Sequence, residues 1–158
     1  NITIPIESLN LNQYLAKTID LIKHLKNYSD VSIINDIDPS VCVDFNPAYL
    51  ESVLLNFTTN AIKYADKNRA IEIKYAFMIE DGKKTLSISD NGLGIDLEKY
   101  GSYLFGMYKT FHNHEGSRGL GLHLTKNQIE SMNGTVSVTS EVGVGTTFKI
   151  TFNDVLSD

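Results

Sequence analysis

Apolar side chains recur with the 3.6-residue period of a helix in three stretches of the chain. This pattern predicts helices over residues 11–26, 47–64 and 119–132. Pro47 suits the first turn of the second helix, and Asn133-Gly134 is a typical end for the third. The apolar faces of the first two helices comprise Leu11, Leu15, Ile19, Ile22 and Leu25, and then Leu50, Leu54, Phe57 and Ala61.

Shorter runs of alternating apolar and polar residues predict strands between these helices. The expected strands cover residues 2–6, 31–34, 41–45, 70–79, 85–89, 135–139 and 146–152. Asp81-Gly82 is a strong hairpin signal, and the last two strands turn through Gly143 and Gly145. Residues 90–118 are expected to form a long loop with one or two short helical pieces, and a loop of this length is usually functional.

The order of these elements is not a regular alternation of strand and helix. It predicts an α/β fold, a two-layer sandwich in which a mixed, mostly antiparallel sheet carries about three helices on one face. With 158 residues, the chain is long enough for one domain, which we expect to span residues 1–158. Because it starts without a methionine, we expect it to be a fragment of a larger protein.

Composition and charge exclude several classes of protein. Hydrophobic residues make up 42% of the chain, which indicates a globular domain, and the net charge of -5 argues against sequence-independent nucleic-acid binding. No apolar run approaches the roughly 20 residues of a membrane span, so no direct membrane contact is expected. The only cysteine, Cys42, lies in an apolar run and is interpreted as a buried strand residue.

The helix at 47–64 carries a polar stripe of Asn56, Asn60 and Lys63, spaced by four and three residues. Amide oxygens are hard ligands that suit Mg²⁺, and a nearby ammonium group suits phosphate. On this helix alone, an ordinary solvated face is the better interpretation of the stripe.

A second candidate is Asp90-Asn91-Gly92-Leu93-Gly94, which follows a predicted strand. A carboxylate at a strand end can accept a hydrogen bond from an exocyclic amine, and the glycines after it allow a planar ring to approach the backbone. In isolation, a simple Asp-Asn-Gly turn explains the segment equally well.

A third candidate is the glycine-rich stretch Gly116–Leu122 at the start of a predicted helix. Unpaired N–H groups at a helix N-terminus favour an anion, and Arg118 adds a planar charge suited to phosphate. A plain helix start is the alternative. The stretch neither follows a strand nor ends in Gly-Lys-Ser/Thr, so both familiar nucleotide-binding folds are disfavoured.

Taken together and in order, these segments and Gly145-Thr146-Thr147-Phe148 resemble the signature boxes of the sensor histidine kinase catalytic domain. The matching segments are Asn56-Phe57-Thr58-Thr59-Asn60-Ala61-Ile62-Lys63-Tyr64, Asp90-Asn91-Gly92-Leu93-Gly94, Gly119-Leu120-Gly121-Leu122 and Gly145-Thr146-Thr147-Phe148. This is the Bergerat ATP-binding fold, shared with DNA gyrase, a heat-shock chaperone family and mismatch-repair ATPases. The resemblance extends from Leu9 to Phe152.

The resemblance implies ATP and Mg²⁺ as ligands, with a role for each matching residue. Asn60 would hold Mg²⁺ with the help of Asn56, and Lys63 would contact phosphate. Tyr64 would flank the adenine, and Asp90 would accept a hydrogen bond from its amino group.

Glycines and the region around them complete the implied site. Gly92 and Gly94 would shape the adenine pocket, and Thr147 would lie near its adenine end. Residues 100–118 would form a mobile lid, from which Lys109 or Arg118 would reach the γ-phosphate. Backbone amides would bind the phosphates from Gly119, Leu120, Gly121 and Leu122.

Differences from the family narrow the range of expected reactions. Hydrolysing relatives place a glutamate base four residues before the metal-binding asparagine, where this chain has Asn56. Because an amide cannot take a proton from water, phosphoryl transfer is favoured over hydrolysis. None of the histidines has the sequence context of a phospho-acceptor; they are His24, His112, His114 and His123.

The resemblance therefore implies the catalytic domain of a cytoplasmic, or membrane-anchored, two-component sensor histidine kinase. Its partners would be a helical dimerisation domain that carries the acceptor histidine and a downstream response regulator. Two alternatives stay open: a serine kinase or anti-sigma-type switch with the same fold, and a non-catalytic nucleotide-binding signalling module.

Overall fold

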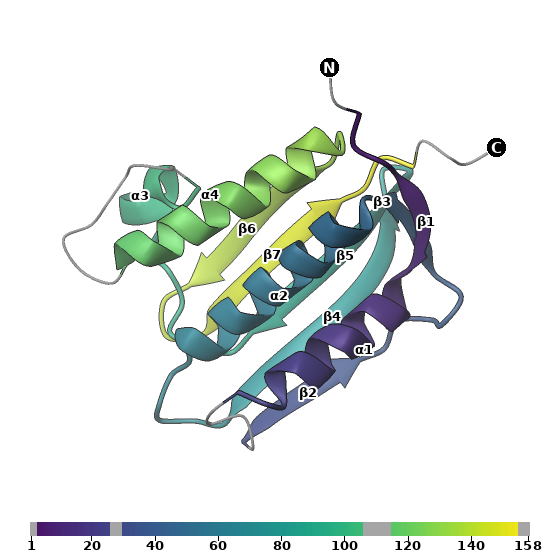
Figure 1. The fold of residues 1–158 in the computed structure, drawn as a ribbon. Coiled ribbons are helices and arrows are strands. Elements are labelled where there is room, and N and C mark those ends of the chain that lie inside the picture. The colour runs from purple at the N-terminus through teal and green to yellow at the C-terminus, as the bar shows by residue number, and fades with distance from the viewer. Residues whose placement is uncertain (1–2, 26–29, 106–114, 155–158) are drawn as a thin grey trace.

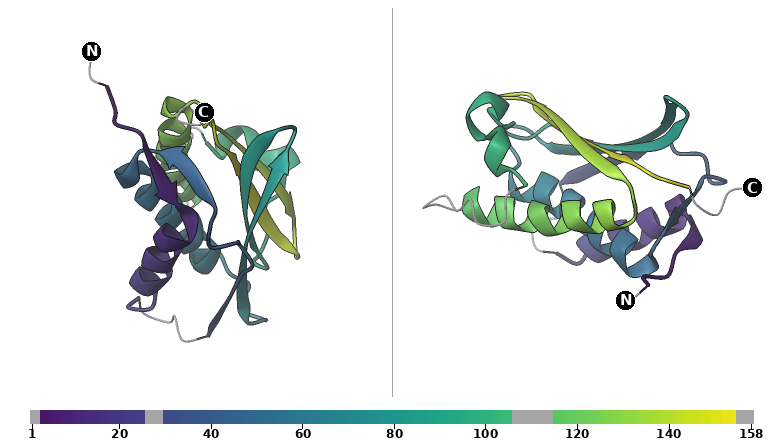
Figure 2. Two further views of the ribbon diagram at one scale, coloured as in Figure 1. Left: turned by 90° about the vertical axis from the view of Figure 1, so that its right-hand side faces the viewer. Right: turned by 90° about the horizontal axis from the view of Figure 1, so that it is seen from above.

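A two-layer sandwich is formed by a five-stranded sheet and three helices that lie on one of its faces (Figures 1 and 2). The computed structural model describes residues 3–25, 30–105 and 115–154, and within 115–121 it describes the helix but not the side chains. The elements are β1 (Glu7–Asn10), α1 (Leu11–Ile22), β2 (Val31–Asn35), β3 (Cys42–Phe45), α2 (Pro47–Lys63), β4 (Ile71–Glu80), β5 (Lys83–Asp90), α3 (Leu97–Tyr100), η1 (Gly101–Tyr103), α4 (Glu115–Ser131), β6 (Thr135–Glu141) and β7 (Gly145–Thr151).

The large sheet has the strand order β2-β4-β5-β7-β6. β2 runs parallel to β4, and the other three pairs are antiparallel. β1 and β3 form a separate antiparallel pair beside it. The predicted class, a mixed and mostly antiparallel sheet with about three helices on one face, is confirmed (Figure 1).

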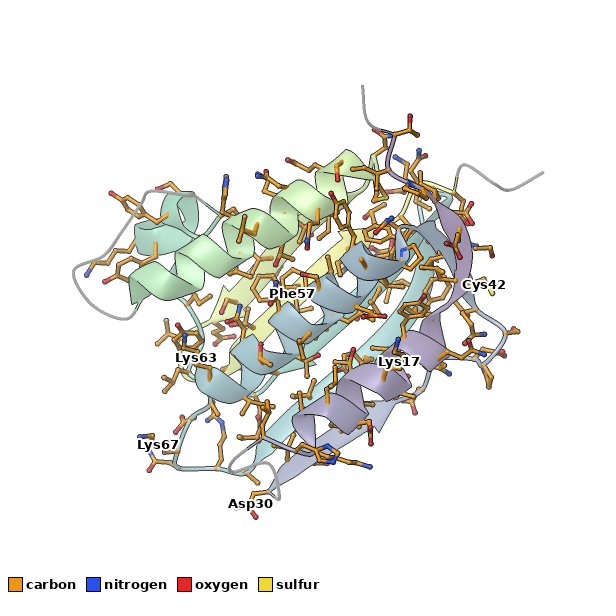
Figure 3. All side chains as sticks on the ribbon, in the orientation of Figure 1. Lys17, Asp30, Cys42, Phe57, Lys63 and Lys67 are labelled. Atoms are coloured by element: carbon orange, nitrogen blue, oxygen red, sulfur yellow. The ribbon has the colours of Figure 1, made fainter. Side chains whose placement is uncertain are left out.

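The core lies between the sheet and the helices α1, α2 and α4 (Figure 2). At its centre, Phe57 of α2 stacks on Phe148 of β7 with ring centroids 4.6 Å apart (Figure 3). The Tyr75 hydroxyl of β4 lies 2.6 Å from the Thr58 hydroxyl, so a buried polar pair also joins the two layers. α2 is therefore fixed against the strands that carry the candidate site.

A surface contact joins the first two helices. The Lys17 ammonium of α1 donates to the Glu51 carboxylate of α2 at 2.7 Å (Lys17 is labelled in Figure 3). This hydrogen bond, with the charge of Glu51, raises the pKa of Lys17. Because both side chains are exposed, the pair contributes little to the stability of the fold.

Two predicted boundaries at the N-terminal end are wrong. The predicted strand at 2–6 is displaced to Glu7–Asn10, where the backbone pairs with β3, and Ile4 and Ile6 only pack against the core from outside a strand. The first helix ends at Ile22 instead of Lys26, because Leu25 is exposed and has no core to pack against. Periodicity in the sequence continues past the point where burial stops.

Two further expectations also need correction. α4 begins at Glu115, four residues before the predicted start at Gly119, so the glycines there lie inside the helix and do not delimit it. Cys42 does lie in a strand, but its side chain is half-buried because β3 belongs to the small two-stranded sheet. In the described part of the chain, no helix is both long and apolar enough to cross a membrane.

Candidate functional site

A small pocket lies between α2, α4 and the ends of β5 and β7. Its lining residues come from all four segments singled out in the sequence. They are Asn60, Tyr64, Asp90, Gly94, Ile95, Leu122, Thr146 and Phe148. The fold thus brings together residues that are far apart along the chain.

Helix and strand periodicity explain why these side chains meet. Asn60 and Tyr64 are four residues apart near the end of α2, so they lie on one face of it. Along β5, the side chains of Leu86 and Ile88 are buried beneath the helices, and strand alternation places Asp90 on that same face. Asp90 therefore ends its strand at the pocket.

The Asp90 carboxylate is held by backbone groups from two segments. Its Oδ1 accepts from the N–H of Gly92 at 2.9 Å and from the N–H of Thr146 at 3.3 Å. Hydrogen bonds to a charged acceptor are stronger than those between neutral groups. The orientation of this carboxylate is therefore set by the loop after β5 and by the start of β7.

The loop after β5 packs closely against the β6–β7 turn at Gly94. This glycine has φ of 77°, and a Cβ built on it would lie 2.1 Å from the Glu141 carbonyl oxygen. Only glycine satisfies both the positive φ and this close approach. Ile95 then donates its N–H to the Ser140 hydroxyl at 2.8 Å, which joins the loop to β6.

The pocket does not include every predicted site residue. Lys63 lies at the end of α2, with its ammonium 5.3 Å from the Tyr64 ring centroid. It lines a neighbouring depression with Lys67 and Arg69 (Lys63 and Lys67 are labelled in Figure 3). Asn56 lies one turn before Asn60, and its Nδ2 donates to the Thr125 hydroxyl of α4 at 3.0 Å. Phosphate binding by Lys63 and metal binding by Asn56 stay predictions.

Thr147 needs a correction in position. Its hydroxyl lies 2.9 Å from that of Ser89, on the face of the sheet opposite the helices. Because neighbouring strand residues point to opposite faces, Thr146 and Phe148 line the pocket and Thr147 does not. Tyr64 does line the pocket, as predicted, and its carbonyl accepts from the Leu93 N–H at 3.2 Å. Gly92 is not among the lining residues, but a Cβ built on it would lie 2.7 Å from the Tyr64 carbonyl oxygen. Lys109 lies outside the described residues.

The glycine-rich stretch is described only in part. The predicted residues Arg118, Gly119, Leu120 and Gly121 lie in the first two turns of α4, where the side chains are outside the described set. Leu122 is fully buried and lines the pocket. Binding of phosphates by the amides of this stretch stays a prediction.

Comparison with known proteins decides the family. The family described as "Histidine kinase-, DNA gyrase B-, and HSP90-like ATPase" matches residues 45–155. The chain belongs to this family. The matched residues contain α2, β4, β5, α4, β6 and β7, and so every element that lines the pocket.

Relatives of this family member include two staphylococcal proteins. "Heme sensor protein HssS" of Staphylococcus saprophyticus is 33% identical over 149 residues, which are 94% of this chain and 32% of that protein. "Signal transduction histidine-protein kinase ArlS" of Staphylococcus aureus is 29% identical over 157 residues, 96% of this chain and 34% of that protein. The chain thus spans about a third of the length of these relatives.

Solved structures share the fold. The catalytic domain of histidine kinase ThkA superposes with a TM-score of 0.77 at 19% identity, covering 94% of this chain and 97% of that one. Full-length ShkA in complex with AMPPNP superposes with a TM-score of 0.76 at 22% identity, covering 96% of this chain and 31% of that one.

Sequence reasoning missed several residues of this family member's pocket. The alternation of side chains along β7 could have predicted Thr146 and Phe148, because Phe148 must face the core and Thr146 lies on the same face. Ile95 follows a recognised motif but carries no polar signal of its own. Arg69, in the loop between α2 and β4, bonds to the segments around the pocket, and nothing in the local sequence pointed to it.

Proposed function

We propose that this chain is the ATP-binding catalytic domain of a two-component sensor histidine kinase. One observation carries the proposal: Asn60, Asp90, Gly94 and Leu122, from three separate motifs of the family, line a single pocket with Thr146. The family match and the similarity to named histidine kinases support the same conclusion.

The pocket suits the adenine end of the nucleotide. Ile95 and Phe148 offer apolar surface for a planar ring, and Asp90 offers a carboxylate whose orientation is fixed by two backbone N–H groups. A carboxylate accepts hydrogen bonds from the amino group of adenine but repels the oxo group that guanine has at the same position. The site therefore selects adenine through Asp90.

Asn60 suits a magnesium ion bound together with the triphosphate. Its amide oxygen is a hard ligand on the wall of the pocket, and Mg²⁺ usually binds through few protein oxygens plus substrate phosphates. The described residues contain no cluster of three or more histidine, cysteine or acidic side chains that could bind a metal without the nucleotide. The ion would neutralise charge on the phosphates.

The reaction we propose is transfer of the γ-phosphoryl group to a histidine of a separate helical domain. The imidazole nitrogen forms the new N–P bond, the bond to the β-phosphate oxygen breaks, and ADP leaves. Asn56 supports transfer over hydrolysis, since its amide is no base for water and its Nδ2 is bonded to Thr125. A response regulator would then receive the phosphoryl group, and the domain would act in the cytoplasm.

A two-step experiment tests this function. The chain is titrated with Mg-ATP, and it is then mixed with ATP and the helical domain of its parent protein, after which phosphohistidine is measured. We expect saturable binding below about 1 mM and acid-labile phosphate on that domain. A folded chain that binds no ATP at about 1 mM would refute the ATP site, whereas binding with phosphoserine, or with no transfer, would point to the switch or the non-catalytic module.

Asn60→Asp is expected to change the metal dependence of ATP binding. A carboxylate beside the phosphates repels them until Mg²⁺ is bound, so ATP affinity should fall about tenfold at micromolar Mg²⁺ and recover at millimolar Mg²⁺. The measurement is ATP affinity across a Mg²⁺ series. Asn153→Asp, an exposed residue after β7, is the matched control, and a series that coincides with the unmodified chain would remove the ligand role of Asn60.

A further inference from the structure

Arg69 forms hydrogen bonds with two loops that are distant from it in sequence. Its Nε donates to the Asn91 carbonyl at 2.7 Å, and its Nη2 donates to the carbonyls of Gly92 at 2.8 Å and Gly143 at 2.9 Å. A weaker contact of 3.4 Å reaches the Val144 carbonyl. The guanidinium group thus joins the loop after β5 to the β6–β7 turn.

The same two segments hold the pocket's carboxylate. The Gly92 N–H donates to Asp90 Oδ1, and its carbonyl accepts from Arg69. On the other side, the Thr146 N–H donates to Asp90 Oδ1, and Thr146 lies two residues after Val144. Arg69 therefore fixes both of the backbone segments that orient Asp90, without lining the pocket itself.

Arginine is the side chain that suits this position. Its planar fork carries five N–H donors in fixed directions, whereas the lysine ammonium is a single point of charge on a flexible stem. Three backbone carbonyls converge on the fork within 3.0 Å, and their partial negative charges face a full positive charge. The side chain is 36% exposed, so water screens these bonds only in part.

Arg69 is also bound to Asp66, three residues before it in the chain. Its Nη1 lies 3.5 Å from the Asp66 carboxylate, and its backbone N–H donates to the Asp66 carbonyl at 3.3 Å. Nearby, the Asn91 amide donates to the Ala70 carbonyl at 2.8 Å and accepts from the Glu72 N–H at 2.8 Å. The loop after β5 is thus tied to the start of β4 on one side and to the β6–β7 turn on the other.

We propose that Arg69 is a positioning residue that sets the selectivity of the pocket for adenine by holding Asp90 in place. This proposal rests on the proposed function, because it assumes that Asp90 binds the adenine amino group. Loss of the fork would let the two loops move apart and the carboxylate turn. Affinity for the adenine amino group would fall, while contacts to the triphosphate would stay.

The test compares ATP with inosine triphosphate, which has an oxo group in place of the adenine amino group. We expect the unmodified chain to prefer ATP by about tenfold or more, the value of a hydrogen bond to a charged group. Arg69→Met should reduce this preference about fivefold, through weaker ATP binding at nearly unchanged affinity for inosine triphosphate. Arg69→Lys keeps the charge but not the fork. Its preference for ATP should lie between that of the unmodified chain and that of Arg69→Met.

Lys67→Met is the matched control. It removes one positive charge from the same loop, and Lys67 (labelled in Figure 3) is an exposed residue that lines the same depression as Arg69. Its preference for ATP should equal that of the unmodified chain. Thermal unfolding of each variant shows whether it is folded, and if Arg69→Met does not fold, Arg69→Lys carries the test.

Three results would overturn the proposal. One is an unchanged preference for ATP in the folded Arg69 variants. Another is equal weakening of both nucleotides, which would make Arg69 a general support of the fold. The third is an unmodified chain that binds both nucleotides equally, because Asp90 would then not read the amino group. An unmodified chain that binds neither nucleotide would instead refute the proposed function.

Discussion

Asp90→Asn is expected to weaken Mg-ATP binding by about a hundredfold while leaving the fold nearly intact. The asparagine Oδ1 can still accept from the N–H groups of Gly92 and Thr146, so the loop and the start of β7 keep their hydrogen bonds. The other oxygen becomes an NH₂ group, which faces the adenine amino group donor to donor. Losing a hydrogen bond to a charged acceptor costs roughly 1.5–3 kcal/mol, and the opposed donors add to this.

The measurement pairs calorimetric titration of ATP with urea unfolding of the same samples. We expect the free energy of unfolding to fall by about 1 kcal/mol or less, because a charge-assisted bond is replaced by a neutral one. Asp81→Asn is the matched control: Asp81 is exposed in the β4–β5 turn at φ of 52°, a conformation that asparagine adopts well. Losses of binding and of stability in equal measure would make Asp90 a structural residue.

Local rules explain where the side chains of Asp90 and Asn60 lie, but only the resemblance of the ordered motifs to the histidine kinase family assigned these two residues to the site. A strand of alternating apolar residues ends at Asp90, and a helical stripe carries Asn60, so each side chain faces the pocket as soon as its element forms. The fold class followed similarly from the order of helices and strands. The prediction that Thr147 lies at the pocket missed by one residue, because neighbouring residues of a strand point to opposite faces of the sheet.

The contacts of Arg69 and Lys63 could not be predicted from the sequence, because local rules do not decide them. The contacts of Arg69 join residues more than 20 and more than 70 positions apart, and only the packed sheet brings those carbonyls together. Lys63 lies on the predicted stripe, but its long side chain reaches a neighbouring depression and the Tyr64 ring. The predicted helix boundary was wrong where burial ends, at Leu25, because the periodicity of apolar residues does not show whether another element covers that face.

Gly145→Ala is expected to be the most damaging single substitution at this site. A Cβ built on Gly145 would lie 2.0 Å from the Asp90 carbonyl oxygen, and the residue has φ of 149°. β7 begins at Gly145 and is paired with β5 from the next residue on, so the clash cannot be relieved without separating the two strands. We expect the free energy of unfolding to fall by about 3 kcal/mol or more, measured by urea unfolding.

Gly143→Ala separates the clash from the backbone conformation. Gly143 also has a positive φ, of 84°, but a Cβ there would meet no atom within 4 Å, so its cost should be limited to about 1–2 kcal/mol of strain. In Gly145→Ala, ATP affinity should fall together with stability, because Thr146 and Asp90 must move apart. Asp90→Asn differs in this respect, because it is expected to lose ATP binding with little loss of stability. Equal stability of the two alanine variants would show that β7 can shift at its start, and the close approach to Asp90 would then not be required.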